Sequence, residues 1–179
     1  LTVYLDAAVN GYHGAKPAGA FYFHVADPLA RLDADDPAQA EADIAKQLQM
    51  KGVALADEEV LSAMDRGDTP VAIPAALTKG GGLRKDARVL DMPQMRALLR
   101  HSRRQATELA EALYGGDTSI RPAESGGASS CDYCDLRGVC GFGADARGAR
   151  AREIAAMKME DLARLLSEAD AGSQAGTDG

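Results

Sequence analysis

The sequence predicts an α/β fold, and three observations support this prediction. Residues 20–27 alternate between apolar and polar side chains, which is typical of a half-buried strand. Residues 92–114 place apolar side chains three and four positions apart, which is typical of an amphipathic helix. Shorter runs of both kinds follow one another along the chain, separated by turns that contain Gly or Pro. Alternating short strands and helices indicate an α/β protein.

Two elements are expected before residue 30. Residues 1–12 predict a helix, because their apolar side chains recur at helical spacing. These side chains belong to Leu1, Tyr4, Leu5 and Ala8. In the strand at residues 20–27, one face carries Phe21, Phe23 and Val25. Since two of the three Phe of the chain lie on that face, we expect it to pack in the core.

Residues 37–90 predict shorter elements. Residues 37–49 indicate a helix with Pro37 near its start. The segment "GVALA" predicts a short strand, Asp57 is a favourable N-cap, and "EEVLSAMD" predicts the short helix that it caps. "VAIPAAL" at residues 71–77 is a strand candidate whose proline limits its pairing. After a Gly-rich turn, "RVL" predicts another short strand.

The clearest element is the long helix that follows Asp91. Asp91 and Gln94 have the spacing of a capping box, in which each side chain accepts from the other residue's backbone N–H. Gly115 and Gly116 end the helix. One stripe of small and apolar residues is expected to pack: Met95, Leu98, Leu99, Ser102, Ala106, Leu109 and Leu113. A second stripe, called the basic stripe below, lies more than about 90° around the helix. It consists of Arg96, Arg100, Arg103 and Arg104.

The last third of the chain is expected to be less regular. Residues 118–130 predict a loop, and residues 143–166 predict a last helix. The final residues have the composition of a disordered tail. We therefore expect a main domain at 1–143 that includes the cysteines, a C-terminal helix at 144–170 and a disordered tail at 171–179.

The composition limits the classes of protein to which the chain can belong. Hydrophobic residues make up 46%, but aromatic residues only 4%, which is a low supply of bulky side chains for a core of this length. The chain begins with Leu and enters a helix at once, so we expect it to be a piece of a longer polypeptide. It contains no run of 18 apolar residues and no signal-peptide pattern, so we expect no membrane span and a cytoplasmic location.

The charge is distributed unevenly. The formal net charge is −7. From Asp27 to Asp68 there are eleven Asp or Glu against four Lys or Arg, whereas from Lys79 to Arg104 there are eight Lys or Arg against two Asp. Because a polyanion responds to the local field, the average charge does not exclude nucleic acid as a partner. Both segments can equally be solvated faces.

All three cysteines lie within ten residues, at Cys131, Cys134 and Cys140. The spacing C-x2-C-x5-C lets thiolates reach one metal from tight turns and argues against a secreted disulfide framework. A zinc site would need a fourth ligand, and its candidates are His13, His24 and His101. None of these has the short spacing of a zinc finger. A [4Fe–4S] cluster usually takes four cysteines, so one would have to come from outside this chain.

Several segments together resemble the C-terminal part of the AddB family, the second subunits of bacterial AddAB helicase–nucleases. "LTVYLDAAV" resembles the helix of RecB-type nucleases written Q-x-x-x-Y, with Tyr4 as its Tyr. "KPAGAFYFHVADP" and "MKGVALADEEVLSAMD" resemble two further family segments. "CDYCDLRGVCGF" resembles the closing cluster segment. The resemblance covers roughly residues 1–143.

This resemblance implies a PD-(D/E)xK nuclease fold, an iron–sulfur cluster, and DNA and an AddA-type subunit as partners. It implies that Cys131, Cys134 and Cys140 are cluster ligands whose fourth partner lies upstream, and that the cluster acts as a structural staple. In the family, the catalytic Asp, Asp/Glu and Lys precede the Q-x-x-x-Y helix; the carboxylates hold Mg²⁺, and the Lys supplies further positive charge. No catalytic residue is therefore assigned in this chain, and Asp6 is interpreted as a surface carboxylate.

Two roles and two alternative functions stay open. Tyr4 is either a neighbour of the active site or a packing residue, and the basic stripe contacts either DNA phosphate, solvent or a partner subunit. The acidic segment Asp27–Asp68 is expected to face away from DNA. The alternatives are an iron–sulfur nuclease of the CRISPR-adaptation type and a zinc-stabilised, non-catalytic interaction module.

Overall fold

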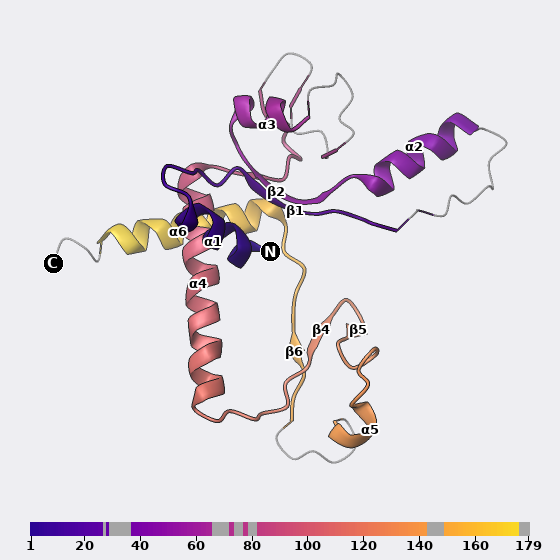
Figure 1. The fold of residues 1–179 in the computed structure, drawn as a ribbon, viewed down its shortest axis with the longest axis vertical. Helices are drawn as coiled ribbons and strands as arrows, with labels where there is room; N and C mark the ends of the chain where they lie inside the picture. Colours follow the sequence, from indigo (N-terminus) through magenta and orange to yellow (C-terminus); the bar gives the residue numbers. More distant parts are fainter. Residues whose placement is uncertain are drawn as a thin grey trace. The chain divides into compact units, whose positions relative to one another are not determined.

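The computed structural model describes residues 1–26, 28, 37–65, 72–73, 77–78, 82–142 and 149–175. The chain divides into two compact units. Unit 1 comprises Leu1–Arg104 together with Ala163–Gly179, and unit 2 comprises Gln105–Leu162. Figure 1 shows the helices and strands of both. None of the described helices combines the length and the apolar character needed to cross a membrane.

Unit 1 is built on a three-stranded sheet in the order β1-β2-β3. Its strands are β1 at Gly19–Tyr22, β2 at Lys51–Leu55 and β3 at Val89–Leu90. The central β2 pairs antiparallel with β1 and parallel with β3. Around this sheet the chain forms helices, so the prediction of an α/β fold is confirmed.

Most helices of unit 1 begin and end close to the boundaries predicted from the sequence. They are α1 (Thr2–Gly11), α2 (Pro37–Leu48), α3 (Glu58–Met64), the first part of α4 (Met92–Tyr114) and most of α6 (Met159–Ala175). Asp57 caps α3, because its carboxylate accepts from the N–H groups of Glu59 and Val60 at 3.0 and 3.2 Å. This confirms the predicted N-cap.

The core of unit 1 lies between β2, α3 and the segment that follows α3. Ala54, Leu61 and Ile73 are buried together, and side chains around them are partly buried. These surrounding side chains are those of Phe21, Met50, Met64, Leu77, Ala87 and Val89. Leu90 of β3 and Met95 of α4 are completely buried. Among the described residues, burial is therefore concentrated at the sheet, at α3 and at the start of α4.

The capping box at the start of α4 is present as predicted. The N–H of Asp91 donates to Gln94 Oε1 at 3.0 Å, and the N–H of Gln94 donates to Asp91 Oδ1 at 2.8 Å. The Gln94 amide also donates to Ser167 Oγ of α6 at 3.1 Å. The same side chain thus fixes the beginning of α4 and ties it to α6.

The helix α4 ends at the predicted glycines. Gly116 has φ = 81°, a left-handed conformation that favours glycine. The N–H of Gly116 donates to the carbonyl of Leu113 at 3.1 Å, and the N–H of Asp117 donates to that of Ala112 at 2.9 Å. These two bonds form a Schellman motif, which satisfies carbonyls that the helix leaves without a partner.

The strand predicted at residues 20–27 is shorter than expected. β1 ends at Tyr22, opposite Lys51, which is the first residue of β2. Beyond this pair, no partner strand continues β1 among the described residues. Phe21 packs against the core, but Phe23 and Val25 are 68% and 86% exposed, so the prediction that they pack beside Phe21 is wrong.

The apolar stripe of α4 is buried only in its first half. Met95 and Leu99 of this stripe are buried, as is Ala97 outside it, whereas Leu109 and Leu113 are 62% and 74% exposed. The prediction for Leu109 and Leu113 is therefore wrong in this structure. Helical spacing indicates which side chains share a face, but burial also requires a neighbour against which that face can pack.

Unit 2 contains a small sheet in the order β5-β4-β6 and a short helix. Besides the rest of α4 and the start of α6, its elements are β4 (Ala123–Ser125), β5 (Ala128–Ser129), β6 (Arg152–Glu153) and α5 (Arg137–Cys140). The expected loop at residues 118–130 is thus a β-hairpin, and that prediction is wrong. Gly126 and Gly127, both with positive φ, form the two-residue turn.

The C-terminal predictions also need correction. A helix was expected at residues 143–166, but β6 lies at Arg152–Glu153 and α6 begins only at Met159. The helix α6 continues to Ala175, inside the expected tail at 171–179. Most of the strand candidate at 71–77 lies outside the described residues, although Leu77 forms an isolated bridge with Leu83.

Candidate metal centre and nucleic-acid surface

The hairpin of unit 2 places Cys131 two residues after the end of β5. The Ser129 N–H donates to Asp132 Oδ2 at 2.8 Å, and the Ser129 hydroxyl accepts from the Cys131 N–H at 3.2 Å. The next residue, Ser130, donates its N–H to the carbonyl of Ala123 in β4, and its hydroxyl accepts from the Ala123 N–H. Cys131 is therefore held by serine and aspartate side chains at the base of a hairpin.

Successive tight turns then carry the chain from Cys131 to Cys140. The N–H of Cys134 donates to the carbonyl of Cys131 at 3.3 Å, and the N–H of Arg137 donates to that of Cys134 at 3.2 Å. Cys140 ends the single turn of α5, and Gly141 follows it with φ = 67°. The prediction of turns between the cysteines agrees with this backbone.

The three thiols are free, and their chemistry suits a metal centre. Cys131 is half-buried, and Cys134 and Cys140 are exposed. Thiolates are the usual ligands of iron–sulfur clusters and of structural zinc. Within the described ranges, however, no three Cys, His, Asp or Glu side chains are grouped closely enough to hold a metal ion. The donor set thus fits, but among the described residues of unit 2 its side chains are not brought together.

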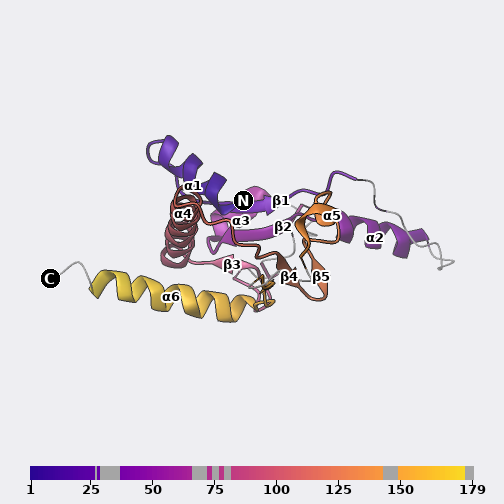
Figure 2. The same cartoon turned by 90° about the horizontal axis from the view of Figure 1, so that it is seen from below.

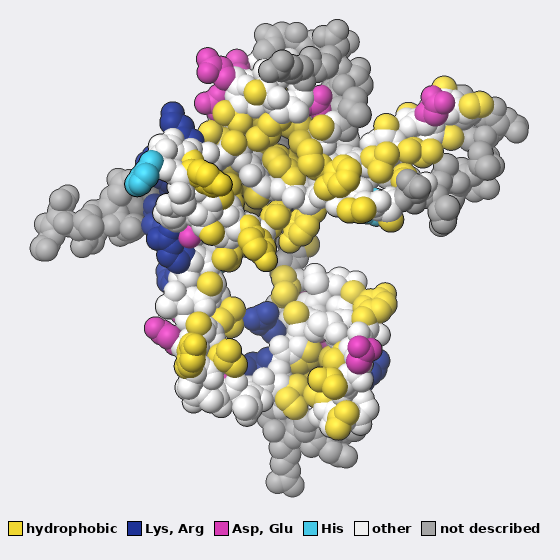
Figure 3. All heavy atoms as spheres, in the orientation of Figure 1, with side chains coloured by type: hydrophobic (Ala, Val, Ile, Leu, Met, Phe, Trp, Pro, Cys, Tyr) yellow, Lys and Arg dark blue, Asp and Glu magenta, His cyan; other side chains and the backbone are white. Residues whose placement is uncertain are grey.

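Unit 2 has no hydrophobic core of its own among its described residues. Every described residue from Gln105 to Leu162 is half-buried or exposed. Large apolar side chains such as Tyr133 and Val139 are 95% and 84% exposed, and Figure 3 shows apolar side chains at the surface. Since burial of apolar surface is the main driving force of folding, we expect the described part of this unit to have little intrinsic stability.

In unit 1, the helix α1 presents Tyr4 to solvent. Tyr4 is 79% exposed, so it is not a packing residue in this structure. The opposite side of α1 faces α4, as Figure 2 shows, and Thr2 accepts a hydrogen bond from Ser102 at 2.7 Å. The geometry therefore leaves Tyr4 accessible, as a neighbour of an active site would be.

A bidentate ion pair also joins α1 to α4. Arg103 donates through Nε to Asp6 Oδ2 at 3.0 Å and through its terminal nitrogen to Asp6 Oδ1 at 2.8 Å. Hydrogen bonding to Asp6, together with the negative charge of Asp6, raises the pKa of the Arg103 guanidinium. Asp6, interpreted from the sequence as a surface carboxylate, has only 16% of its side chain exposed. Sequence reasoning missed this pair, because 97 residues separate its members.

The basic stripe is exposed along the first half of α4. Arg96, Arg100, Arg103 and Arg104 are all solvent-exposed, and Figure 3 shows Lys and Arg side chains in the region of this helix. They are not equivalent, since Arg103 binds Asp6 and Arg104 contacts His101 at 3.3 Å. The stripe is thus a basic surface in which the charge of Arg103 is already paired with a carboxylate.

Comparison with known proteins supplies the family. Residues 1–141 match the PD-(D/E)XK nuclease superfamily, a range that includes α1, the sheet of unit 1 and all three cysteines. The chain belongs to the PD-(D/E)XK nuclease superfamily. The exposed Tyr4 and the mixed sheet are therefore parts of a nuclease fold, as the resemblance implied.

Several curated relatives are similar over most of the chain. The chain is 33% identical over 175 residues to the B subunit of the ATP-dependent helicase/deoxyribonuclease of Alkaliphilus metalliredigens, and the match covers 94% of the chain and 15% of that protein. Proteins of the same name are 36% identical over 162 residues in Moorella thermoacetica and 31% identical over 175 residues in Thermoanaerobacter sp.. These matches cover 86% and 94% of the chain and 14% and 15% of the two relatives. The chain thus spans about 15% of the length of these curated relatives.

Proposed function

We propose that the chain forms the C-terminal part of the nuclease domain in a helicase/deoxyribonuclease subunit of the AddB type. The superfamily match over residues 1–141 supports this proposal. The similarity to the B subunits of several ATP-dependent helicase/deoxyribonucleases supports it as well. Such a protein would act in the cytoplasm with an AddA-type partner. It would use ATP and process DNA double-strand ends for recombinational repair.

In this proposal Cys131, Cys134 and Cys140 supply three ligands of a [4Fe–4S] cluster, and a cysteine outside the chain supplies the fourth. The cluster, when bound, would cross-link distant parts of the polypeptide rather than carry out redox chemistry. Two observations support a structural role. The thiols follow a hairpin with ordered turns, and the unit that carries them lacks buried side chains among its described residues.

The catalytic Mg²⁺ is not assigned to this chain. Among the described residues no group of carboxylates is arranged to hold a metal ion. We propose that the metal-binding carboxylates and the Lys lie in another part of the polypeptide. The role left to this chain is to present Tyr4 near that site, through the contacts of α1 with α4. The 179 residues alone are accordingly expected to show no Mg²⁺-dependent cleavage of DNA.

The basic stripe is proposed to contact DNA phosphate. Arg pairs well with phosphate oxygens, and the stripe lies on the same helix that holds α1. The positive charge of the stripe contrasts with the negative charge of the segment Asp27–Asp68. We propose that this acidic segment faces away from DNA, because a polyanion would be repelled there. The stripe would bind DNA without reading its sequence, because it would contact the backbone only.

The decisive experiment is metal and activity analysis of the complete polypeptide, purified without oxygen. We expect about four iron and four sulfide per polypeptide and Mg²⁺-dependent degradation of linear duplex DNA. Cys131→Ser should lower the iron content, whereas Val139→Ala, which changes an exposed side chain in the same segment, should leave it unchanged. Stoichiometric zinc without iron would contradict the cluster, and absence of nuclease activity at full metal content would contradict the proposed function.

A further inference from the structure

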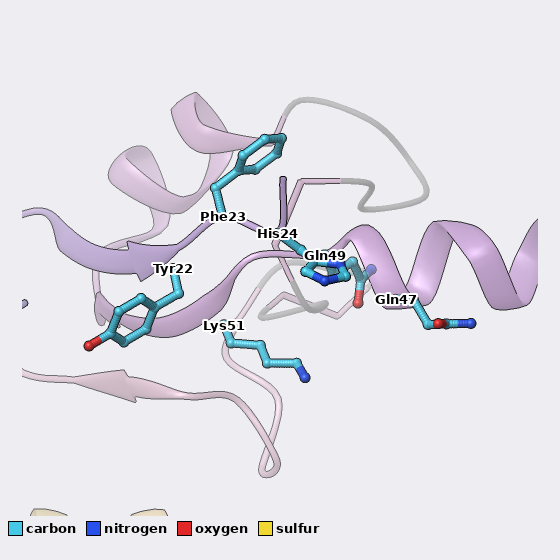
Figure 4. A pocket seen from close by; sticks show the side chains of 6 residues that line it. All are labelled: Tyr22, Phe23, His24, Gln47, Gln49 and Lys51. Carbon is cyan, nitrogen blue, oxygen red and sulfur yellow. The ribbon is translucent and has the colours of Figure 1, made fainter. Parts of the chain in front are cut away.

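A cavity opens beside the end of the paired strands β1 and β2 in unit 1. Its volume is ≈ 250 Å³, and six side chains line it, as Figure 4 shows. They are those of Tyr22, Phe23, His24, Gln47, Gln49 and Lys51. This volume is below the usual range for whole drug-sized ligands, so the cavity suits one flat ring system rather than a large ligand.

The end of β1 carries two aromatic rings that do not pack in the core. Tyr22 is 66% and Phe23 is 68% exposed. In Figure 4 their side chains point to opposite sides of the strand. The two rings are exposed because β1 loses its partner at Tyr22. This residue pairs with Lys51, the first residue of β2, so no residue of β2 lies opposite Phe23. Each ring therefore offers a free face at the strand end, where one planar group can stack on it.

Polar groups of suitable chemistry surround these rings. Lys51 is directly opposite Tyr22 in the strand register, so the two side chains share one face of the strand pair. His24 and the amides of Gln47 and Gln49 add hydrogen-bond donors and acceptors. None of the six lining side chains is a carboxylate. The six described side chains that line the cavity thus combine aromatic faces, a cation and amides.

This chemistry matches a nucleotide of a single strand. An aromatic ring binds the face of a base, a lysine binds the phosphate, and amides bind base edges. In a duplex the faces of the bases are covered by their neighbours, so only a single strand can use the rings. Three of the lining residues, Gln47, Gln49 and Lys51, belong to the acidic segment Asp27–Asp68. The stretch that contains them, residues 44–52, nevertheless has two lysines and no Asp or Glu.

We propose that this cavity and the strand end beside it bind two nucleotides of single-stranded DNA, with Tyr22 and Phe23 each stacking on a different base and Lys51 contacting a phosphate. The proposal rests on the proposed function, because it assumes that DNA is the substrate. It adds a preference for an unwound strand at a surface distinct from Tyr4 and from the basic stripe. The site would hold the strand through stacking, whereas the stripe would hold it through charge alone.

Equilibrium binding of a fluorescent oligo-dT by the complete polypeptide, in buffer without Mg²⁺, tests the stacking. Replacing Tyr22 and Phe23 by Ala should weaken binding by roughly 5- to 150-fold for each ring that stacks on a base. Tyr12→Ala is the matched control, since Tyr12 is 73% exposed and does not line the cavity. An oligonucleotide of the same length without bases should bind the wild type and the double variant equally.

Lys51 is tested through the dependence of binding on salt. Lys51→Ala should reduce the slope of log K against log salt by about 0.7, the value for one phosphate contact on a single strand. Lys85→Ala, which changes an exposed lysine outside the cavity, is the control. If oligo-dT binds normally but the double variant behaves like Tyr12→Ala, this proposal is wrong and the proposed function stands. If the wild type binds no DNA at all, both are wrong.

Discussion

At the scale of single residues, Gly52 decides how closely β1 approaches β2. A Cβ atom at this position would lie 2.0 Å from the carbonyl oxygen of Ala20 and 2.7 Å from the Cα atom of Phe21. Both are backbone atoms, so no side-chain rotation can relieve the clash. Gly52 is therefore required by a close approach of two strands rather than by its own backbone conformation.

We predict that Gly52→Ala destabilises the sheet of unit 1 by at least about 2 kcal/mol, since overpacking a well-packed site typically costs 1–3 kcal/mol. The measurement is amide hydrogen exchange of β1 and β2 in the complete polypeptide. Gly11→Ala is the control, because a Cβ at Gly11 meets no atom within 4 Å. Equal protection in the two variants would mean that β1 does not pair with β2 in this register.

A second prediction at the scale of residues is that the arginines of the basic stripe contribute unequally to DNA binding. Arg103 donates two hydrogen bonds to Asp6, so its charge is already compensated. If the stripe binds DNA phosphate, Arg96→Ala should lower the salt slope of DNA binding by about 0.7–0.9, and Arg103→Ala should lower it less. Salt titrations of the two variants measure this difference. Identical slopes would show that Asp6 does not reduce the contribution of Arg103.

At the scale of elements, the start of α4 is fixed by its capping box. Asp91→Ala removes the acceptor of the Gln94 N–H and should cost about 1 kcal/mol, as for other N-caps. Asp91→Asn keeps an acceptor oxygen and should cost much less. Hydrogen exchange of the first turn of α4 should therefore become about fivefold faster in the Ala variant only. Similar exchange in both variants would contradict the cap.

The sequence predicted those elements whose signals are local. The capping box at Asp91, the N-cap at Asp57 and the glycines after Tyr114 each act within a few residues, and each is present in the structure. The end of β1 was missed because it depends on where the partner strand begins. The hairpin at Gly126 and Gly127 did have a local signal, two glycines between short runs, but the runs are too short to show alternation.

The candidate site was predictable in its residues but not in its arrangement. Spacing alone identified Cys131, Cys134 and Cys140 as possible ligands, and the structure supplies the turns between them without gathering their side chains. The ion pair of Asp6 with Arg103 and the cavity at Tyr22 and Lys51 both depend on contacts across the fold. No pattern in a single sequence indicates such contacts, because periodicity reports only which residues share a face.

At the scale of the whole molecule, the two units differ in what stabilises them. Unit 1 has buried side chains on its sheet and helices, such as Leu90 and Met95. The described part of unit 2 has none, and its small sheet rests on a few backbone hydrogen bonds. If a cluster bound by the cysteines provides the missing stability, its loss should affect unit 2 and leave unit 1 folded.

We therefore predict that Cys131→Ala, in the complete polypeptide, abolishes hydrogen-exchange protection of the hairpin at Ala123–Ser129 and preserves it in β2. Ligand loss removes the constraint on unit 2, whereas the core at Ala54 and Leu61 does not depend on it. Val139→Ala is the control in the same segment, and prolonged treatment of the wild type with an iron chelator should reproduce the effect of Cys131→Ala. Loss of protection in both units would show that the cluster stabilises the whole chain. Unchanged protection of the hairpin would show that unit 2 is held by packing against other parts of the polypeptide instead.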